Sequence, residues 1–153
     1  MHFNKYNVSV SCFNVTACKV LYDNDYLIDH GPGVASSELK AGSPLPPPTF
    51  THLSIANFPR PAVATWVSQD GSVHSEKIDT GAIFADRRIR HAAPPELIAK
   101  DTPSGTPIIY IVINDRTVYV YMISSVYLSE REDPSDRFSN VRDETILAYS
   151  RKY

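Results

Sequence analysis

The stretch Pro107–Leu128, PIIYIVINDRTVYVYMISSVYL, constrains the fold more than any other part of the chain. Residues 108–113 form an unbroken β-branched and aromatic run, Asn114-Asp115 interrupts it, and Thr117–Ile123 resumes it. Such side chains favour a pleated, packed surface, and a polar pair between two such runs predicts a β-hairpin. Because little of either run is polar, we expect both faces of both strands to be covered, as in the centre of a sheet.

A transmembrane helix is the alternative for this stretch. In that arrangement Asn114, Asp115 and Arg116 would lie in the middle of the bilayer, and each apolar half would be too short to span it. We therefore expect no stable membrane span. The residues after Met1, HFNKYNVSVSC, contain no apolar core segment, so no secretory signal is visible.

Length and composition predict one soluble globular domain, residues 1–153. A chain of 153 residues is long enough to bury a sizeable core. Hydrophobic residues at 42% and charged residues at 21% are ordinary for such a domain. The net charge of -2 argues against nucleic-acid binding, which normally needs a basic face. The nine tyrosines suit both strands and protein interfaces.

Alternating apolar and polar residues predict further strands on either side of a polar connection. The expected strands are Tyr6–Cys12, Cys18–Tyr22 and Tyr26–Asp29, which would form a three-stranded meander, then Phe50–Phe58, and finally Pro61–Ser68 and Ser72–Ile78 around an Asp-Gly turn. In the last hairpin Trp66 shares a face with Ala62 and Ala64, which leave room for its ring. The connection Gly31–Thr49 contains a stiff Pro46-Pro47-Pro48 run. It is either a recognition loop or a plain crossing between sheet edges.

Three segments predict short helices. Gly81–Arg90 and Pro94–Ala99 fit single turns, the second beginning with prolines that a first turn tolerates. Asp143–Lys152 could be a strand, but its apolar residues Ile146, Leu147 and Tyr149 fit a helical face better, with acids at its start and bases at its end. The predicted fold is mainly β (α+β): a curved antiparallel sheet or β-sandwich with two or three short helices.

The only two cysteines, Cys12 and Cys18, flank a predicted turn. A disulfide between them would stabilise the fold by roughly 2–3 kcal/mol through loop closure. The alternative is two buried thiols in neighbouring strands. No second cysteine pair or spaced histidine pair accompanies them, which argues against a metal site.

The residues offer little for catalysis. Nucleophile-elbow, phosphate-loop and His-Glu-x-x-His patterns are all missing from the sequence. The five histidines are scattered and never fall at metal-ligand spacing. His52 and His74 could meet across neighbouring strands, although solvent-facing or capping roles are the alternative. We therefore expect no enzymatic activity, no cofactor and no bound metal.

Acidic side chains gather at two predicted loop tips, and these are the candidate partner-binding residues. One tip holds Asp23 and Asp25. The other, in Ser129–Asn140, holds Glu130, Glu132, Asp133 and Asp136. Acids on a loop can steer the approach of a basic partner. The alternative is that they only keep the loops soluble.

Two passages resemble a known family: PAVATWVSQDGSVHSEKIDTGAIFAD, Pro61–Asp86, and FSNVRDETILAYSRKY, Phe138–Tyr153. They look like small bacterial immunity proteins encoded beside type VI secretion effectors, especially phospholipase effectors. The resemblance implies a non-enzymatic inhibitor that binds one cognate effector, the product of an adjacent gene, and works in the periplasm after removal of a leader. Because no leader is visible, the cytoplasm is the alternative compartment. The alternative function is a structural or adaptor module of a phage or secretion apparatus that self-associates.

Overall fold

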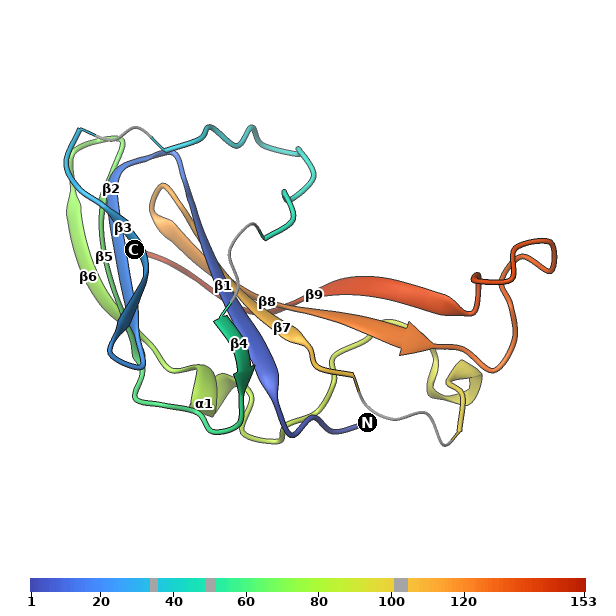
Figure 1. The fold of residues 1–153 in the computed structure, drawn as a ribbon. Coiled ribbons are helices and arrows are strands. Elements are labelled where there is room, and N and C mark those ends of the chain that lie inside the picture. Colours follow the sequence, from blue (N-terminus) through green and yellow to red (C-terminus); the bar gives the residue numbers. More distant parts are fainter. Residues whose placement is uncertain (34–35, 49–51, 101–104) are drawn as a thin grey trace.

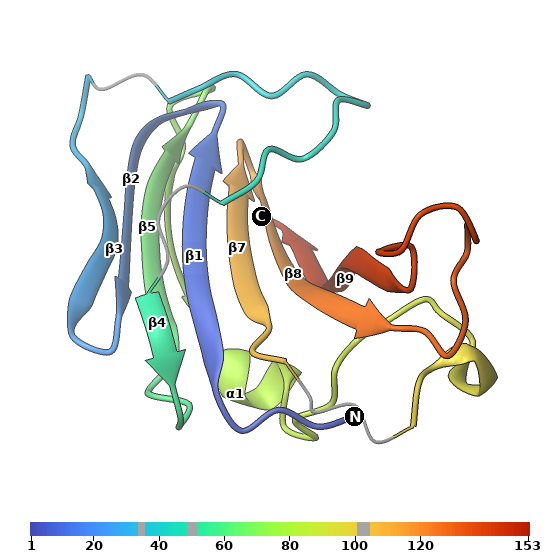
Figure 2. The same ribbon diagram turned by 45° about the vertical axis from the view of Figure 1, so that its right-hand side comes forward.

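A computed structural model describes residues 1–33, 36–48, 52–100 and 105–153, and within these ranges the chain forms a β-sandwich (Figures 1 and 2). One sheet has the strand order β4-β1-β7-β8-β9 and the other the order β3-β2-β5-β6. The strands are β1 Tyr6–Phe13, β2 Val15–Tyr22, β3 Asp25–His30, β4 His52–Ile55, β5 Ala62–Ser68, β6 Val73–Ile78, β7 Ile108–Asn114, β8 Thr117–Tyr127 and β9 Val141–Lys152. Two short helices complete it, α1 Thr80–Ile83 and the 3-10 helix η1 Pro95–Leu97. The predicted mainly β fold is confirmed.

The core lies between the two sheets. Residues two apart in a strand share a face, so every second residue of the inner strands is buried. Ala62, Ala64 and Trp66 are all fully buried on the inner face of β5, as their spacing predicts. β7 is buried on both faces from Ile109 to Ile113, as expected. The expectation of two covered faces is wrong for β8, whose outer face is half-buried and becomes exposed at Ser125 and Tyr127.

Local turn chemistry accounts for the hairpins. Asp23 and Asn24 both adopt positive φ, 51° and 65°, and close a two-residue turn between β2 and β3. Gly71, with φ 84°, turns β5 into β6. Asp115, with φ 52°, follows β7 at the tight turn into β8. These are polar residues or glycine, which tolerate this backbone region.

The predicted three-stranded meander is wrong, although all three of its strands exist. β1 and β2 follow one another but belong to different sheets, and the chain crosses between the sheets at Asn14, which has φ 55°. β1 pairs in parallel with β7, with Val10 opposite Ile111. Only β2 and β3 form the expected hairpin. Alternation predicts a strand but not its partner.

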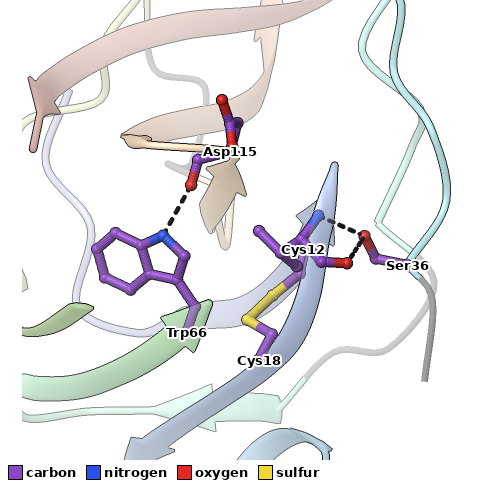
Figure 3. The surroundings of a disulfide bond; sticks show 6 residues. Cys12, Cys18, Ser36, Trp66 and Asp115 are labelled. Carbon is purple, nitrogen blue, oxygen red and sulfur yellow. Dashed lines mark hydrogen bonds between the residues drawn. A yellow bond between two sulfur atoms is a disulfide. The ribbon is translucent and has the colours of Figure 1, made fainter. Parts of the chain in front are cut away.

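A disulfide joins Cys12 to Cys18, and their Cα atoms are 6.6 Å apart (Figure 3). Of the two alternatives from the sequence, the structure therefore has the bonded form. Because Cys12 lies in β1 and Cys18 in β2, the bond links the two sheets at the corner where the chain crosses between them.

The predicted helix over Asp143–Lys152 is also wrong, since this segment is strand β9, paired with β8. The register shifts between Leu147 and Tyr149. Because of that bulge, Ile146 and Tyr149 lie opposite the buried residues Met122 and Val120, so residues three apart share the inner face. A bulge within the strand thus imitates the spacing of a helix.

Other predicted boundaries need smaller changes. The expected strand Phe50–Phe58 is reduced to β4, with Phe50 outside the described residues. The predicted helices at Gly81–Arg90 and Pro94–Ala99 contain α1 and η1, each shorter than expected. The predicted loop Gly31–Thr49 is irregular over residues 36–48, and residues 34, 35 and 49 lie outside the described part.

The β8–β9 hairpin projects beyond the sandwich, with the loop of residues 129–140 at its far end (Figures 1 and 2). Its inner face is covered by an irregular segment rather than by the second sheet. Ala93 and Ile98 pack there against Val126 and Leu128. Two main-chain hydrogen bonds attach the segment, from Ser129 N to Leu97 O (2.8 Å) and from Ala99 N to Tyr127 O (2.9 Å).

Candidate functional site

The outer face of the five-stranded sheet carries an apolar patch, part of which is covered by residues 36–48, here called the strap (Figure 2). Phe13, Tyr110 and Val112 form a buried cluster on this face, against which Leu39 and Leu45 of the strap pack. The buried phenol of Tyr110 donates to Ser11 Oγ at 2.8 Å, and the carbonyl oxygen of Pro46 in the strap lies 3.2 Å from it. Burial raises the pKa of this phenol.

Beside the strap the same face is only partly covered, and its apolar side chains on β7 and β8 are half-buried. We call its residues the open strip: Ile108, Tyr119, Tyr121, Ile123 and Leu147. Tyr121 lies opposite both Tyr110 and Leu147, so one apolar row crosses β7, β8 and β9. The rings of Tyr119 and Tyr121 stack with centroids 6.0 Å apart, and Leu147 is 49% exposed. A connected apolar surface with tyrosines is typical of a protein-binding site.

The loop at the end of the projecting hairpin, residues 129–140 and here called the tip, is shaped by its own hydrogen bonds. Ser139 Oγ accepts from Asp133 N at 2.9 Å, and the carbonyl oxygens of Asp133 and Asp136 lie 2.7 and 2.9 Å from it as acceptors. Asp133 Oδ1 accepts from the backbone N and the hydroxyl of Ser135, at 2.9 and 2.6 Å. These bonds hold the pKa of Asp133 below its usual range.

The four acids of the tip therefore differ in what they offer a partner. Asp136 Oδ1 accepts from Phe138 N at 3.0 Å, so Asp133 and Asp136 both shape the loop. Glu132 Oε1 lies 3.4 Å from Arg142 Nε in a half-exposed ion pair. Within the described part of the chain, the exposed carboxylate of Glu130 has no hydrogen-bond or ion-pair partner.

The other predicted pair of acids lies far from the tip, at the turn between β2 and β3 (Figure 1). Asp25 Oδ2 is 3.5 Å from His52 Nε2, and the side chains of Asp25 and His52 are 66% and 49% exposed. Because Asp25 is in β3 and His52 in β4, this contact connects edge strands of the two sheets. The two acidic groups cannot belong to one small binding surface.

His52 and His74 do not meet, contrary to the sequence-based possibility, because β4 and β6 are in different sheets. The ring of His74 stacks on Trp66 with centroids 4.8 Å apart. Its Nε2 is 3.1 Å from Ser68 Oγ, which donates to Asp70 Oδ1 at 2.7 Å.

This serine, histidine and aspartate are not ordered as in a hydrolase triad. In such a triad the histidine lies between the acid and the serine and removes the serine proton. Here Ser68 lies between His74 and Asp70, is fully buried, and directs its proton to the carboxylate. Asp70 also accepts from Ser72 N at 2.9 Å and pairs with Arg116. The group stabilises the turn between β5 and β6.

The described residues also limit what the site could hold. They contain no group of three or more His, Cys, Asp or Glu side chains placed to hold a metal ion. Over the same ranges, the helices are too short or too polar to cross a membrane.

Comparison with known proteins gives no match: no family model fits the chain, and neither a curated protein nor a solved structure is significantly similar to it. The open strip was not predicted as a site. Its signal is present in β8, where Tyr119, Tyr121 and Ile123 alternate with the buried Val118, Val120 and Met122. An unbroken apolar run does not reveal which of its two faces remains open.

Proposed function

We propose that this chain is an immunity protein that binds a cognate secreted antibacterial effector, of the phospholipase class by the family resemblance, and neutralises it without catalysis of its own. The observation that carries the proposal is the projecting β8–β9 hairpin, which ends in an acidic tip held by its own hydrogen bonds. A preorganised loop loses little conformational entropy on binding. Its acids would steer the approach of a basic cleft.

The open strip supports the same proposal because it continues the hairpin surface toward the strap. A standard protein interface buries about 800 Å² on each partner. A loop alone supplies only part of such an area, whereas a loop together with a sheet face can supply all of it. Tyrosines and aliphatic side chains on that face bury well against a partner.

The disulfide supports a periplasmic site of action. Bonds of this kind persist in oxidising compartments and are rare where thiol reductants are abundant. Cys18 is fully buried and Cys12 nearly so, which fits a structural bond rather than a redox-active pair.

A self-associating adaptor is the second candidate, and the observation that favours it is the position of β9. This strand, Val141–Lys152, ends its sheet, and its outer edge has no neighbouring strand among the described residues. Edge strands of this length can pair with another chain. The bulge at Leu147–Tyr149 and the charged residues of β9 act against such pairing.

The test is co-expression with the protein encoded by the adjacent gene, directed to the periplasm. An immunity protein restores growth and co-purifies with that product as a stable complex. If growth is not restored and no complex forms, the proposal is wrong. A closed homo-oligomer in light scattering, without a complex, would favour the adaptor.

A further inference from the structure

We propose that Phe138 is the anchor of the interface and that it enters an apolar pocket of the effector whose rim is basic. This inference rests on the proposed function and names the part of the surface that supplies most of the affinity. Tyr127 and Val141, which lie opposite one another where the hairpin meets the tip, add two further exposed apolar side chains at the base of the loop.

Phe138 is unusual because a large apolar side chain is exposed on a backbone that is fixed on both sides. The residue is 65% exposed. Its N–H donates to Asp136 Oδ1 at 3.0 Å, and its carbonyl oxygen accepts from Val141 N at 3.1 Å. Because the backbone is already ordered, burying the ring against a partner requires little additional loss of conformational entropy. The guanidinium of Arg137 lies 4.6 Å from the ring centroid and leaves much of the ring open.

The surface around Phe138 continues into the outer face of the hairpin. Val141 and Tyr127 are opposite one another on β9 and β8, and they are 37% and 39% exposed. The next pair on this face, Ser125 and Asp143, joins through a side-chain hydrogen bond. Beyond it the open strip begins. The inner face is not available in the same way, because residues 89–99 cover it.

The charges of the tip define the chemistry of the partner. The loop 129–140 contains four acids and two arginines, so the tip as a whole has an excess of negative charge, and one of the arginines, Arg137, lies against the Phe138 ring. Interfaces commonly have an apolar centre that supplies most of the binding energy, surrounded by a polar rim. An aromatic centre with an acidic rim fits a pocket that is apolar inside and lined by Lys or Arg at its mouth.

The experiment measures binding of the purified product of the adjacent gene to Phe138→Ala, Tyr127→Ala and Leu53→Ala. Leu53 is the matched control because it is 69% exposed but lies on β4, at the other edge of the sheet. Phe138→Ala should weaken binding about 30-fold or more, chiefly through faster dissociation. Leu53→Ala should stay within about twofold of the wild type.

The possible outcomes distinguish a failure of the Phe138 proposal from a failure of the proposed function. Phe138→Ala and Leu53→Ala should unfold at the wild-type temperature, since both removed side chains are largely exposed. If the wild type binds and Phe138→Ala binds equally well, the anchor is wrong and the proposed function stands. An equal loss in Leu53→Ala would also overturn the anchor. If the wild type does not bind, the function and the anchor are both overturned.

Discussion

The indole Nε1 of Trp66 donates a 2.7 Å hydrogen bond to the carbonyl oxygen of Asp115 and so ties the two sheets together (Figure 3). Trp66 is in β5, whereas Asp115 is in the turn between β7 and β8 of the other sheet. The carboxylate of Asp115 accepts from Gln69 N at 3.0 Å, so this one residue receives one bond from β5 and one from the turn that follows β5. Arg116 adds an ion pair with Asp70 and a 2.8 Å bond to the main-chain oxygen of Tyr153.

Replacement of Trp66 by phenylalanine should destabilise the fold by roughly 2–4 kcal/mol. The change leaves the Asp115 carbonyl without its buried donor and opens space beside Ala64. Urea unfolding followed by circular dichroism measures the free energy of unfolding. Val63→Ala, on the exposed face of the same strand, is the control and should change it by less than about 0.5 kcal/mol. Equal effects of the two substitutions would contradict the proposed tie between the sheets.

The strands were predictable from the sequence because each carries its own pattern. β5 and β6 alternate and flank an Asp-Gly turn, and β7 and β8 are rich in β-branched residues. Their partners were not predictable in the same way. The parallel pairing of β1 with β7 joins segments about a hundred residues apart, with Val8 opposite Ile109, and no local propensity encodes it. In β9, pairing with β8 overrides a pattern that a bulge had made helix-like.

The candidate site was predictable only in part. Acidic residues in a charged segment predict an outward loop, and residues 129–140 do form one. The sequence does not show that Asp133 and Asp136 are engaged in turns while Glu130 is free to meet a partner, because those roles depend on contacts with Ser135 and Phe138. The open strip depends on the placement of the strap, which lies far away in the sequence.

Removal of the disulfide should lower the free energy of unfolding by roughly 2–3 kcal/mol without changing the fold. The double variant Cys12→Ala, Cys18→Ala deletes a bond that links β1 to β2 across the sheets. Urea unfolding with and without dithiothreitol measures the loss. The double variant serves as its own control, since reductant should not affect it. A wild-type chain that is equally stable with reductant present would contradict a stabilising role.

Stability should fall as the pH rises above about 10, the ordinary tyrosine pKa. Burial raises the pKa of Tyr153 to about 12 and also raises the pKa values of Tyr6, Tyr22, Tyr110 and Tyr121. At a pH between the pKa of a tyrosine in the unfolded chain and its higher pKa in the folded protein, the unfolded chain binds fewer protons than the folded one. The free energy of unfolding therefore decreases as the pH rises.

This stability is fully present below the unfolded pKa and is lost as the pH passes through the folded values. Urea unfolding at a series of alkaline pH values, with tyrosinate absorbance followed in parallel, measures the decrease. Tyr6→Phe removes one of the shifted groups and should make the decrease shallower. A free energy of unfolding that stays constant across this range would show that the buried phenols do not resist ionisation.

Ser139→Ala should loosen the tip and leave the sandwich unchanged. The hydroxyl holds Asp133 N and lies within bonding distance of the carbonyls of Asp133 and Asp136. Amide hydrogen exchange should therefore become faster at Asp133 and its neighbours, with no change in the strands. Ser150→Ala, on an exposed position of β9, is the matched control. Unchanged exchange at the tip would mean that Ser139 does not order the loop.

Glu130 and Asp133 should respond differently to neutralisation when binding to the adjacent gene product is measured at low and moderate salt. Glu130→Gln removes an exposed carboxylate that has no structural role among the described contacts. It should slow association and reduce the dependence of the association rate on salt. The free energy of unfolding and the amide hydrogen exchange of the tip should not change. Asp133→Asn weakens the turn at Ser135, so it should also raise amide exchange in the tip. Removing a rim charge acts mainly on the association rate, whereas loosening the loop also raises the entropy lost on binding. If neither variant changes the association rate or its dependence on salt, the acids of the tip only keep the loop solvated, and electrostatic steering by this hairpin is wrong.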